Sequence, residues 1–333
     1  MALPPPDPKF DLRGVSAEVN CLHFSCNVPK PRPPLLFSGS SSGKIHVWNL
    51  NTRRAETILC GHGGKSVFWI YTLPDREQLM SQGRDLQICI WNLAEGRNEV
   101  TESIPLDRVC FCKCSLLDTQ RPLLAIPGTE NSQVQVVDLD CQKIICSMTP
   151  TTDVPWGMAM CMKLWQPNFG CSPLLIVGYE DGSVALWNVL EHKLISRYMF
   201  HTEPVMSLDF DCDSARGVSG SAENILNVWS LDKQQDFKYG GLCTAIYKAQ
   251  ELVNPGIADV KIRQDKKILA TAGWDYRVRI FGWKKVKPLA VLQYHSATVH
   301  CVSFSDHIIP EERLLAAGSK DQRISLWSIY SQT

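Results

Sequence analysis

Short apolar runs alternate with polar turn formers along the whole chain. Residues 45–48 and 184–187 are typical: each run is rich in β-branched and aromatic residues and follows a glycine and a polar turn. This pattern favours strands over helices. Two further apolar runs precede each such segment, as residues 174–177 and 205–210 illustrate. With one outer strand added, each unit predicts a four-stranded sheet.

The unit recurs seven times, and a large apolar residue marks its third strand. These landmark residues are Trp48, Trp91, Val137, Trp187, Trp229, Phe281 and Trp327. Their spacings of 43, 46, 50, 42, 52 and 46 residues resemble the period of about 40 to 45 residues of propeller blades. We therefore predict an all-β fold, a single seven-bladed β-propeller over residues 1–333. The approximate blades are 19–60, 65–103, 106–148, 158–200, 203–250, 256–293 and 297–330.

The two ends of the sequence are expected to close this propeller. An open propeller would expose unpaired strand edges. The last repeat stops soon after Trp327, with no room for an outer strand, whereas residues 9–14 form a strand-like piece ahead of the first repeat. We predict that Phe10 and Leu12 complete the last blade.

Polar residues recur at matching offsets in several repeats. The second repeat has His62 before its first strand, Ser81 on its second, Asp85 in the next turn and Trp91 on its third. This arrangement resembles the WD40-repeat family, in which these positions form a buried hydrogen-bonded set. Because the set recurs in part, we interpret it as structural rather than catalytic. The other members are His201, Ser219 and Trp229 in the fifth repeat, with Glu223 replacing Asp; Thr271 and Asp275 in the sixth; His295, Asp321 and Trp327 in the seventh, with Ala317 at the Ser position; and Asp181 and Trp187 in the fourth.

Segments throughout the chain, among them residues 81–86, 178–184 and 268–275, are similar to the G-protein β-subunit-like branch of that family. The resemblance implies an adaptor in the co-chaperone machinery, the triple-T complex, that matures PI3-kinase-like protein kinases. G-protein β-subunits themselves carry a long N-terminal helix that pairs with a γ-subunit. Here the residues before the closing strand include Pro4, Pro5, Pro6 and Pro8, which oppose such a helix. We expect no Gγ partner.

Composition favours proteins over nucleic acids and membranes as partners. Lysine plus arginine and aspartate plus glutamate each number 34, so the net charge is zero, and a neutral chain has no general affinity for nucleic acid or anionic membranes. No apolar stretch is long enough to span a membrane. The 14 cysteines are scattered without a CxxC pair, which indicates reduced thiols. We expect a protein of the cytoplasm, and of the nucleus as well, that is monomeric on its own.

The turn between the second and third strands opens on the face that WD40 proteins commonly use to bind partners. Trp and Arg are frequent hot-spot residues, so Trp274 is the leading candidate contact; packing against a neighbouring blade is the alternative. Residues 233–257 depart most from the repeat and predict an extended loop that carries the outer strand of the fifth blade; residues 149–156 are a smaller departure. The candidate partner-binding residues are Arg84, Glu180, Trp274, Arg277, Lys320 and Arg323.

Other chemistries fit less well. Cys110, Cys112 and Cys114 alternate, so on a strand they would share one face, but alternate side chains lie nearly 7 Å apart, too far for one zinc ion. The basic run 284–287 is interpreted as a solvated turn. No phosphate loop, zincin helix or nucleophile elbow occurs. We therefore predict no catalytic residue, no cofactor and no metal.

A second role is the substrate receptor of a cullin-based ubiquitin ligase. Some WD40 proteins fill it through a Trp-Asp-x-Arg motif, and residues 274–277 match those letters. The match precedes the third strand, whereas the ligase motif follows the third-strand Trp. The favoured prediction is a non-catalytic interaction scaffold.

Overall fold

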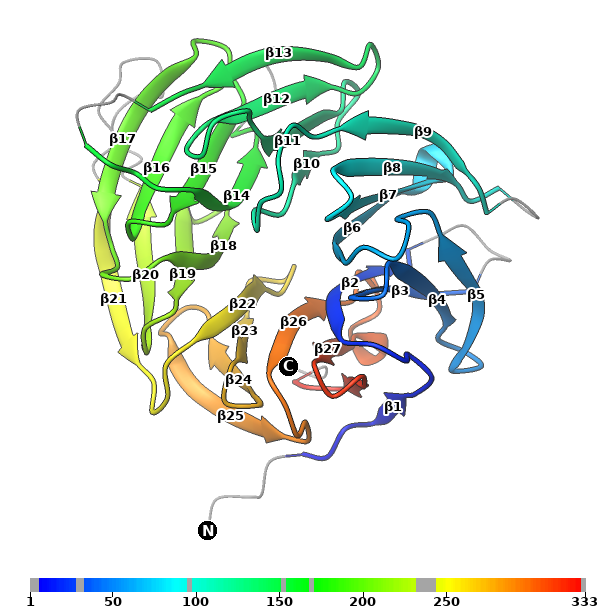
Figure 1. The fold of residues 1–333 in the computed structure, drawn as a ribbon. Coiled ribbons are helices and arrows are strands. Elements are labelled where there is room, and N and C mark those ends of the chain that lie inside the picture. Colours follow the sequence, from blue (N-terminus) through cyan, green and yellow to red (C-terminus); the bar gives the residue numbers. More distant parts are fainter. Residues whose placement is uncertain are drawn as a thin grey trace. The chain divides into compact units, whose positions relative to one another are not determined.

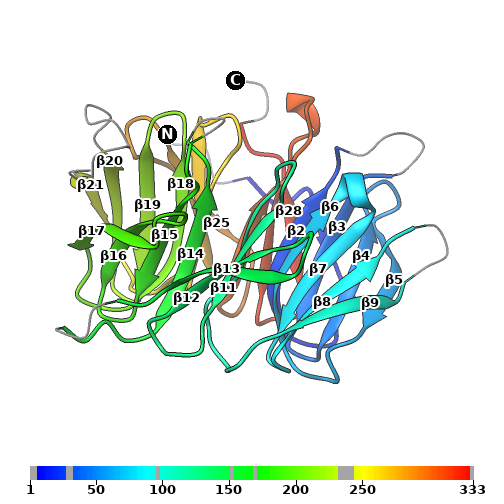
Figure 2. The ribbon, with the colours of Figure 1, turned by 90° about the horizontal axis from the view of Figure 1, so that it is seen from above.

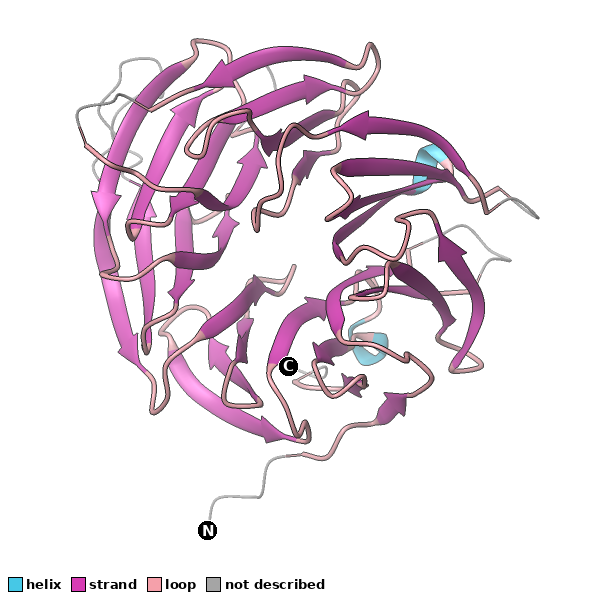
Figure 3. Cartoon of the chain, in the orientation of Figure 1, coloured by secondary structure: helices cyan, strands magenta, loops and turns pink. Residues whose placement is uncertain are grey.

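The computed structural model describes residues 6–27, 33–94, 98–150, 154–167, 171–231 and 244–330. Within these ranges the chain forms 28 strands and two short 3-10 helices, so strands dominate the cartoon in Figure 3. The strands are arranged as seven four-stranded sheets. The predicted fold class, an all-β chain with the seven four-stranded blades of a β-propeller, is confirmed.

The chain divides into two compact units, Met1–Pro105 with Lys261–Thr333, and Leu106–Val260. The first unit contains blades 1, 2 and 7 and most of blade 6. Blade 1 consists of β2 (Val19–Ser25), β3 (Leu35–Ser40), β4 (Lys44–Asn49) and β5 (Arg54–Cys60). Blade 2 consists of β6 (Val67–Leu73), helix η1 (Pro74–Arg76), β7 (Gln78–Gly83), β8 (Gln87–Asn92) and β9 (Val100–Pro105). Figure 2 shows β6, β7, β8 and β9 side by side.

Blade 6 begins at the unit boundary, and blade 7 follows it. Blade 6 consists of β22 (Ile257–Ile262), β23 (Ile268–Gly273), β24 (Arg277–Gly282) and β25 (Lys287–Gln293). Blade 7 consists of β26 (Val299–Phe304), helix η2 (Pro310–Glu312), β27 (Leu315–Ser319), β28 (Ile324–Trp327) and the N-terminal strand β1 (Phe10–Leu12).

The second unit contains blades 3, 4 and 5, drawn in green to yellow in Figure 1. Blade 3 consists of β10 (Ser115–Leu117), β11 (Leu123–Pro127), β12 (Val134–Asp138) and β13 (Lys143–Met148). Blade 4 consists of β14 (Ala159–Trp165), β15 (Leu174–Tyr179), β16 (Ser183–Asn188) and β17 (Lys193–Met199). Blade 5 consists of β18 (Val205–Asp211), β19 (Arg216–Ser221), β20 (Ile225–Leu231) and β21 (Thr244–Glu251).

The landmark residues lie on the third strand of every blade and are at most 3% exposed. In six blades the pairing between the third and outer strands shifts register immediately before the landmark, as between Val47 and Trp48 or Ile90 and Trp91. Such a bulge bends the strand and increases its twist. In these six blades the bulge accompanies the burial of the landmark side chain.

The glycines that open the first and the last repeat have a packing role. A Cβ atom on Gly39 would lie 2.8 Å from Cγ1 of Val67, and one on Gly318 would lie 2.6 Å from Cγ1 of Val19. In both cases the valine belongs to the first strand of the next blade. Because any side chain would push these strands apart, the glycine permits close contact between consecutive blades.

Strand β1 completes blade 7, so the predicted pairing of the closing strand is confirmed. Phe10 pairs with Leu326 and Leu12 with Ile324. Leu12 is 1% exposed and belongs to an apolar cluster with residues of blades 1 and 7. The guanidinium group of Arg53, in blade 1, lies 3.4 Å from the centre of the Phe10 ring.

The expectation of a strand around Cys110, Cys112 and Cys114 was wrong, because β10 begins only at Ser115. The register pairs Ser115 with Ala125 on β11, so a longer β10 would soon lie opposite Pro127, which has no N–H to donate. The three thiols are nevertheless buried.

Two predicted departures from the repeat are partly visible. Strand β21 is the outer strand of blade 5, as expected for residues 233–257, although residues 232–243 lie outside the described residues, as do residues 151–153 of the other departure. In the described ranges, 13 cysteines form no disulfide bond. No helix in those ranges has the length and apolar character needed to cross a membrane.

Candidate functional site

The complete polar set of blade 2 forms one directed chain of hydrogen bonds. The indole Nε1–H of Trp91 donates to Oγ of Ser81 over 2.8 Å, and Oγ of Ser81 lies 2.7 Å from Nε2 of His62. Nδ1 of His62 lies 2.9 Å from a carboxylate oxygen of Asp85. Since a carboxylate only accepts, Nδ1 carries the proton and Nε2 accepts from the Ser81 hydroxyl. Each of these four side chains therefore has a hydrogen-bond partner within the set.

Blades 5 and 7 build the same chain of hydrogen bonds with replaced members. In blade 5, His201 bonds Ser219 at 2.9 Å and Glu223, so Glu replaces Asp. Trp229 donates to Ser219 over 3.3 Å. The predicted members of this blade therefore lie together.

In blade 7, His295 lies 2.9 Å from Asp321, but its serine is on a different strand. Ser325 of β28 replaces the missing hydroxyl: its Oγ lies 2.8 Å from Nε2 of His295 and accepts from Nε1 of Trp327 at 2.8 Å. The repeat pattern in the sequence places Ala317 at the serine position, so it did not identify Ser325.

Arginines replace the histidine in two other blades. In blade 6, Arg279 donates to both carboxylate oxygens of Asp275, at 3.0 and 2.6 Å, and the hydroxyl of Thr271 has no hydrogen-bond partner among the described residues. In blade 4, Arg197 of the outer strand pairs with Asp181 and its guanidinium group lies 3.9 Å from the ring centre of Trp156. The sequence did not indicate either arginine, although an arginine inside the apolar strand β24 is a usable signal.

One position connects these variants: the residue two before the landmark, which shares its face of the strand. In blade 2 this residue is Cys89, whose Sγ lies 3.9 Å from Nδ1 of His62. In blades 5, 6 and 7 it is Asn227, Arg279 and Ser325, which contact His201, Asp275 and His295 respectively. The polar set is therefore adjusted mainly by exchange at this position.

Among the described residues, His62, Asp85 and Cys89 are the group of metal-ligating side chains that lie close enough together to hold an ion. Both imidazole nitrogens of His62 already have partners. Burial raises the pKa of the Cys89 thiol to about 11, which disfavours the thiolate that a metal needs. These side chains fit a structural hydrogen-bonded set better than a metal centre.

Burial also opposes charge on other histidines. It lowers the pKa of His201 and of His295, and it lowers the pKa of His23 on β2 to about 4. His23 Nε2 lies 2.8 Å from the hydroxyl of Thr72. His201 and His295 are also buried, so their imidazoles favour the neutral form and offer no open side to a substrate.

The predicted partner-binding residues occupy the turns between second and third strands, except Arg277, which is the first residue of β24. Trp274 is 41% exposed, and Arg84, Lys320 and Arg323 are exposed as well, whereas Arg277 is half-buried. Lys320 Nζ lies 3.7 Å from a carboxylate oxygen of Glu18. The structure brings the turns of Trp274 and Lys320 together through Thr298, whose hydroxyl lies 3.4 Å from the Trp274 carbonyl and whose own carbonyl accepts from the Lys320 N–H.

Glu180 is exposed in the second unit. Its Oε2 accepts from the backbone N–H of Met158 over 2.9 Å, so this carboxylate also has a local role. Tyr276, close to Trp274 in the chain, was not selected from the sequence, yet its side chain is 49% exposed.

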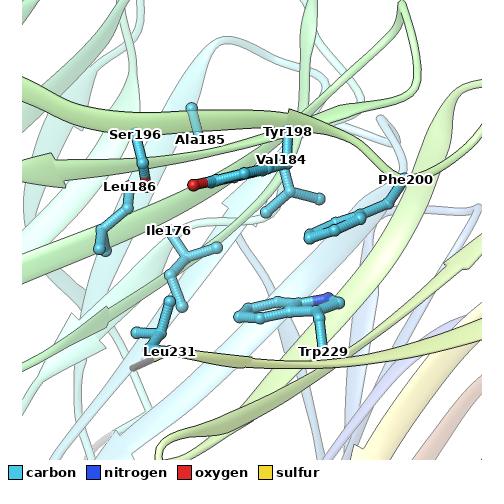
Figure 4. A pocket seen from close by; sticks show the side chains of 9 residues that line it. All are labelled: Ile176, Val184, Ala185, Leu186, Ser196, Tyr198, Phe200, Trp229 and Leu231. Atoms are coloured by element: carbon cyan, nitrogen blue, oxygen red, sulfur yellow. The ribbon is translucent and has the colours of Figure 1, made fainter. Parts of the chain in front are cut away.

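An apolar pocket lies between blades 4 and 5. Figure 4 shows Tyr198 and Phe200 above Trp229, with Ile176 and Leu231 beside them. Ser196 and Tyr198 contribute hydroxyl groups to the lining, and the remaining side chains are apolar apart from the Trp229 indole N–H, which is bonded to Ser219. None of the described side chains that line this pocket is a carboxylate, an imidazole or a thiol, so we interpret it as a packing gap between blades.

The seven blades and the recurring chain of Trp, Ser, His and Asp define a WD40-type β-propeller, a class of protein-interaction scaffold. The family model described as "WD domain, G-beta repeat" matches residues 7–49, 192–230 and 286–328. The chain is 52% identical to mouse guanine nucleotide-binding protein subunit beta-like protein 1, over 98% of this chain and 97% of that protein. It therefore belongs to the WD40-repeat family, in the group of guanine nucleotide-binding protein subunit beta-like protein 1.

More distant similarity links the chain to fungal proteins. It is 27% identical to ASTRA-associated protein 1 of Schizosaccharomyces japonicus, over 98% of this chain and 99% of that protein. It is 26% identical to the Schizosaccharomyces pombe protein of the same name, with the same coverage.

Proposed function

We propose that this protein is a non-catalytic adaptor that supports maturation and stability of PI3-kinase-like protein kinases together with the triple-T co-chaperone complex. It would act in the cytoplasm and the nucleus. Similarity along the whole chain, to the mouse β-like protein and to the fungal proteins, is the observation that carries the proposal. The fungal relatives are named as ASTRA-associated, and association with a larger assembly agrees with an adaptor.

The geometry supports a binding role over a catalytic one. The His, Ser and Asp side chains that could suggest a catalytic triad are joined in closed hydrogen-bonded chains, and the side chain of His62 is 0% exposed. By contrast, the turns with Trp274 and Arg323 present large side chains to solvent. Exposed aromatic and arginine side chains are typical of interface hot spots.

The experiment is affinity purification of the tagged protein from cells, with mass spectrometry. The intact chain is compared with a Trp274→Ala, Arg277→Ala variant and with a Lys284→Ala, Lys285→Ala control, in which exposed residues between β24 and β25 of the same blade are changed. We expect the intact chain and the control to recover triple-T subunits and PI3-kinase-like kinases. The Trp274 variant should recover at most about a tenth as much.

Two outcomes would contradict the proposal. If none of these proteins is recovered, the adaptor role in kinase maturation is wrong. If a cullin adaptor is recovered instead, the ubiquitin-ligase function replaces the adaptor function. The position of the motif argues against that outcome, because β24 begins at Arg277 and residues 274–276 therefore precede the third strand.

A further inference from the structure

The turn between β23 and β24 combines two energetically unfavourable features. Trp274 and Tyr276 expose 41% and 49% of their surface. In addition, Tyr276 has a φ angle of +70°, a left-handed conformation that disfavours residues with a Cβ atom. A large exposed aromatic residue in a strained backbone conformation is more often kept for binding than for folding.

The same position in other blades shows that the fold does not require this residue. Blades 1 and 4 have Gly43 and Gly182 there, with φ angles of +78° and +89°. Blades 2 and 7 have Leu86 and Gln322, at +65° and +67°. A glycine would relieve the strain and remove the exposed ring, so the geometry of the turn does not explain the presence of Tyr276.

The neighbouring turn of blade 7 adds charge to this aromatic pair. Thr298 connects the two turns through the contacts with Trp274 and Lys320 described above. Arg323, at the end of the blade 7 turn, lies near His295: burial lowers the pKa of that histidine, and the arginine acts in the same direction. We refer to residues 274–277 and 320–323 together as the aromatic–basic surface.

The charges of this surface are sorted by sign. Its carboxylates point inward: Asp275 is paired with Arg279 and Asp321 with His295, and their side chains are 13% and 6% exposed. Its outward charges are cationic, because Lys320 and Arg323 are exposed, and Arg277 adds a half-buried cation. One neighbouring carboxylate, Glu18, is 38% exposed and lies 3.7 Å from Lys320 Nζ, so it offsets part of this charge. A chain with zero net charge thus presents a locally positive surface beside two exposed aromatic rings.

We propose that the aromatic–basic surface binds an acidic segment of a partner protein that places an apolar side chain against Trp274 and Tyr276. Charge complementarity favours aspartate and glutamate around the anchor, and the rings supply a rigid apolar contact. The proposal rests on the adaptor function, since it specifies how the adaptor recognises a partner, and its test uses purified components so that the two can fail separately.

The test is selection from a random peptide library displayed on phage, against the immobilised full chain. Phage that also bind a Trp274→Ser, Tyr276→Gly variant are removed. We expect the enriched peptides to be rich in Asp and Glu around one aromatic or large aliphatic residue. A fluorescein-labelled copy of the most enriched peptide is then measured by fluorescence anisotropy. Its Kd should rise about tenfold or more in Tyr276→Gly and in Arg277→Glu, Arg323→Glu, and should also rise with salt.

Matched controls separate a lost contact from a damaged fold. Leu86→Gly makes the same backbone change in blade 2, and Lys284→Glu, Lys285→Glu makes the same charge change in a different turn of blade 6; both should bind like the intact chain. Tyr276→Gly should melt at no lower temperature than the intact chain, because glycine suits the left-handed position.

Three results would overturn the proposal: no enrichment over the variant, enrichment of neutral or basic peptides, or equal loss of binding in the Leu86→Gly control. None of these depends on kinases or co-chaperones. If acidic peptides are enriched but the cell experiment recovers no triple-T subunits, the adaptor function is rejected and the proposed binding surface is retained. The reverse result would keep the function and place its binding site elsewhere.

Discussion

The second-to-third-strand turns of blades 2 and 6 have similar sequences but make different contacts. Arg84, Asp85 and Leu86 form the first turn, and Trp274, Asp275 and Tyr276 form the second. Asp85 reaches out of its turn to His62 and completes a chain of buried hydrogen bonds. Asp275 is instead neutralised by Arg279, four residues further along the chain, and two aromatic rings of the turn face solvent.

The difference lies in how each turn is connected to the rest of its blade. In blade 2 the carboxylate connects separate segments, so changing it disturbs several strands at once. In blade 6 the ion pair is local, the landmark is Phe281, whose side chain has no N–H to satisfy, and Thr271 has no hydrogen-bond partner for its hydroxyl within the described ranges. We therefore expect the turn of blade 6 to contribute less to stability than the turn of blade 2.

The largest expected difference between blades 2 and 6 follows from loss of the serine or threonine hydroxyl on the second strand. Ser81→Ala removes the partner of both His62 Nε2 and Trp91 Nε1, leaving two buried polar atoms unsatisfied. We expect the free energy of unfolding to fall by about 2 to 4 kcal/mol. Thr271→Val removes the equivalent hydroxyl of blade 6, which bonds none of the described residues, and keeps the β-branched shape, so stability should stay unchanged or rise by about 1 kcal/mol.

Urea denaturation of both variants measures these changes. Equal losses in the two variants would mean that the Thr271 hydroxyl does bond in solution, and the proposed difference between the blades would be wrong. A loss in Ser81→Ala that Ser81→Thr largely restores would assign the effect to the hydroxyl itself.

The sequence predicted the strands and the closing pairing because they depend on periodic apolar positions and on one unpaired edge. It did not predict Ser325 or Arg279, since each replaces a partner that the family pattern places on another element. Their shared position, two residues before the landmark, becomes meaningful only when the strand face is seen. The strand expected at Cys112 failed because pairing is limited by Pro127 on the neighbouring strand, which a local pattern cannot report. Exposure of Trp274 likewise depends on how adjoining turns pack.

A smaller effect concerns pH, because a buried imidazole pairs with the turn aspartate of blade 7, whereas an arginine pairs with the turn aspartate of blade 6. Burial lowers the pKa of His295, so the unfolded chain takes up a proton at a higher pH than the folded chain. Stability is therefore full above the ordinary histidine pKa of about 6.5 and decreases as pH falls below it. The loss is about 1.4 kcal/mol for each tenfold difference in acidity constant between the two states.

The measurement is the free energy of unfolding between pH 7.5 and pH 5.5, for the intact chain and for His295→Gln. The variant should be less stable at pH 7.5, since Asp321 and Ser325 each lose one hydrogen-bond partner, but its stability should depend less on pH. If the variant and the intact chain have the same pH dependence, His295 does not contribute to the loss of stability at low pH. The proposed difference in acid sensitivity between blades 6 and 7 would then be wrong.

The smallest expected effect tests the contrast between the two turns directly. Tyr276→Gly relieves a left-handed residue and removes a ring that is 49% exposed, so the free energy of unfolding should rise by about 0.5 to 1 kcal/mol. Leu86→Gly relieves the same strain in blade 2 but gives up a half-buried side chain, so its stability should stay within about 0.5 kcal/mol of the intact chain. Parallel urea titrations resolve the order of the two variants. If Tyr276→Gly proves the less stable of the two, the Tyr276 ring contributes to packing, and the blade 6 turn stabilises the fold no less than the blade 2 turn does.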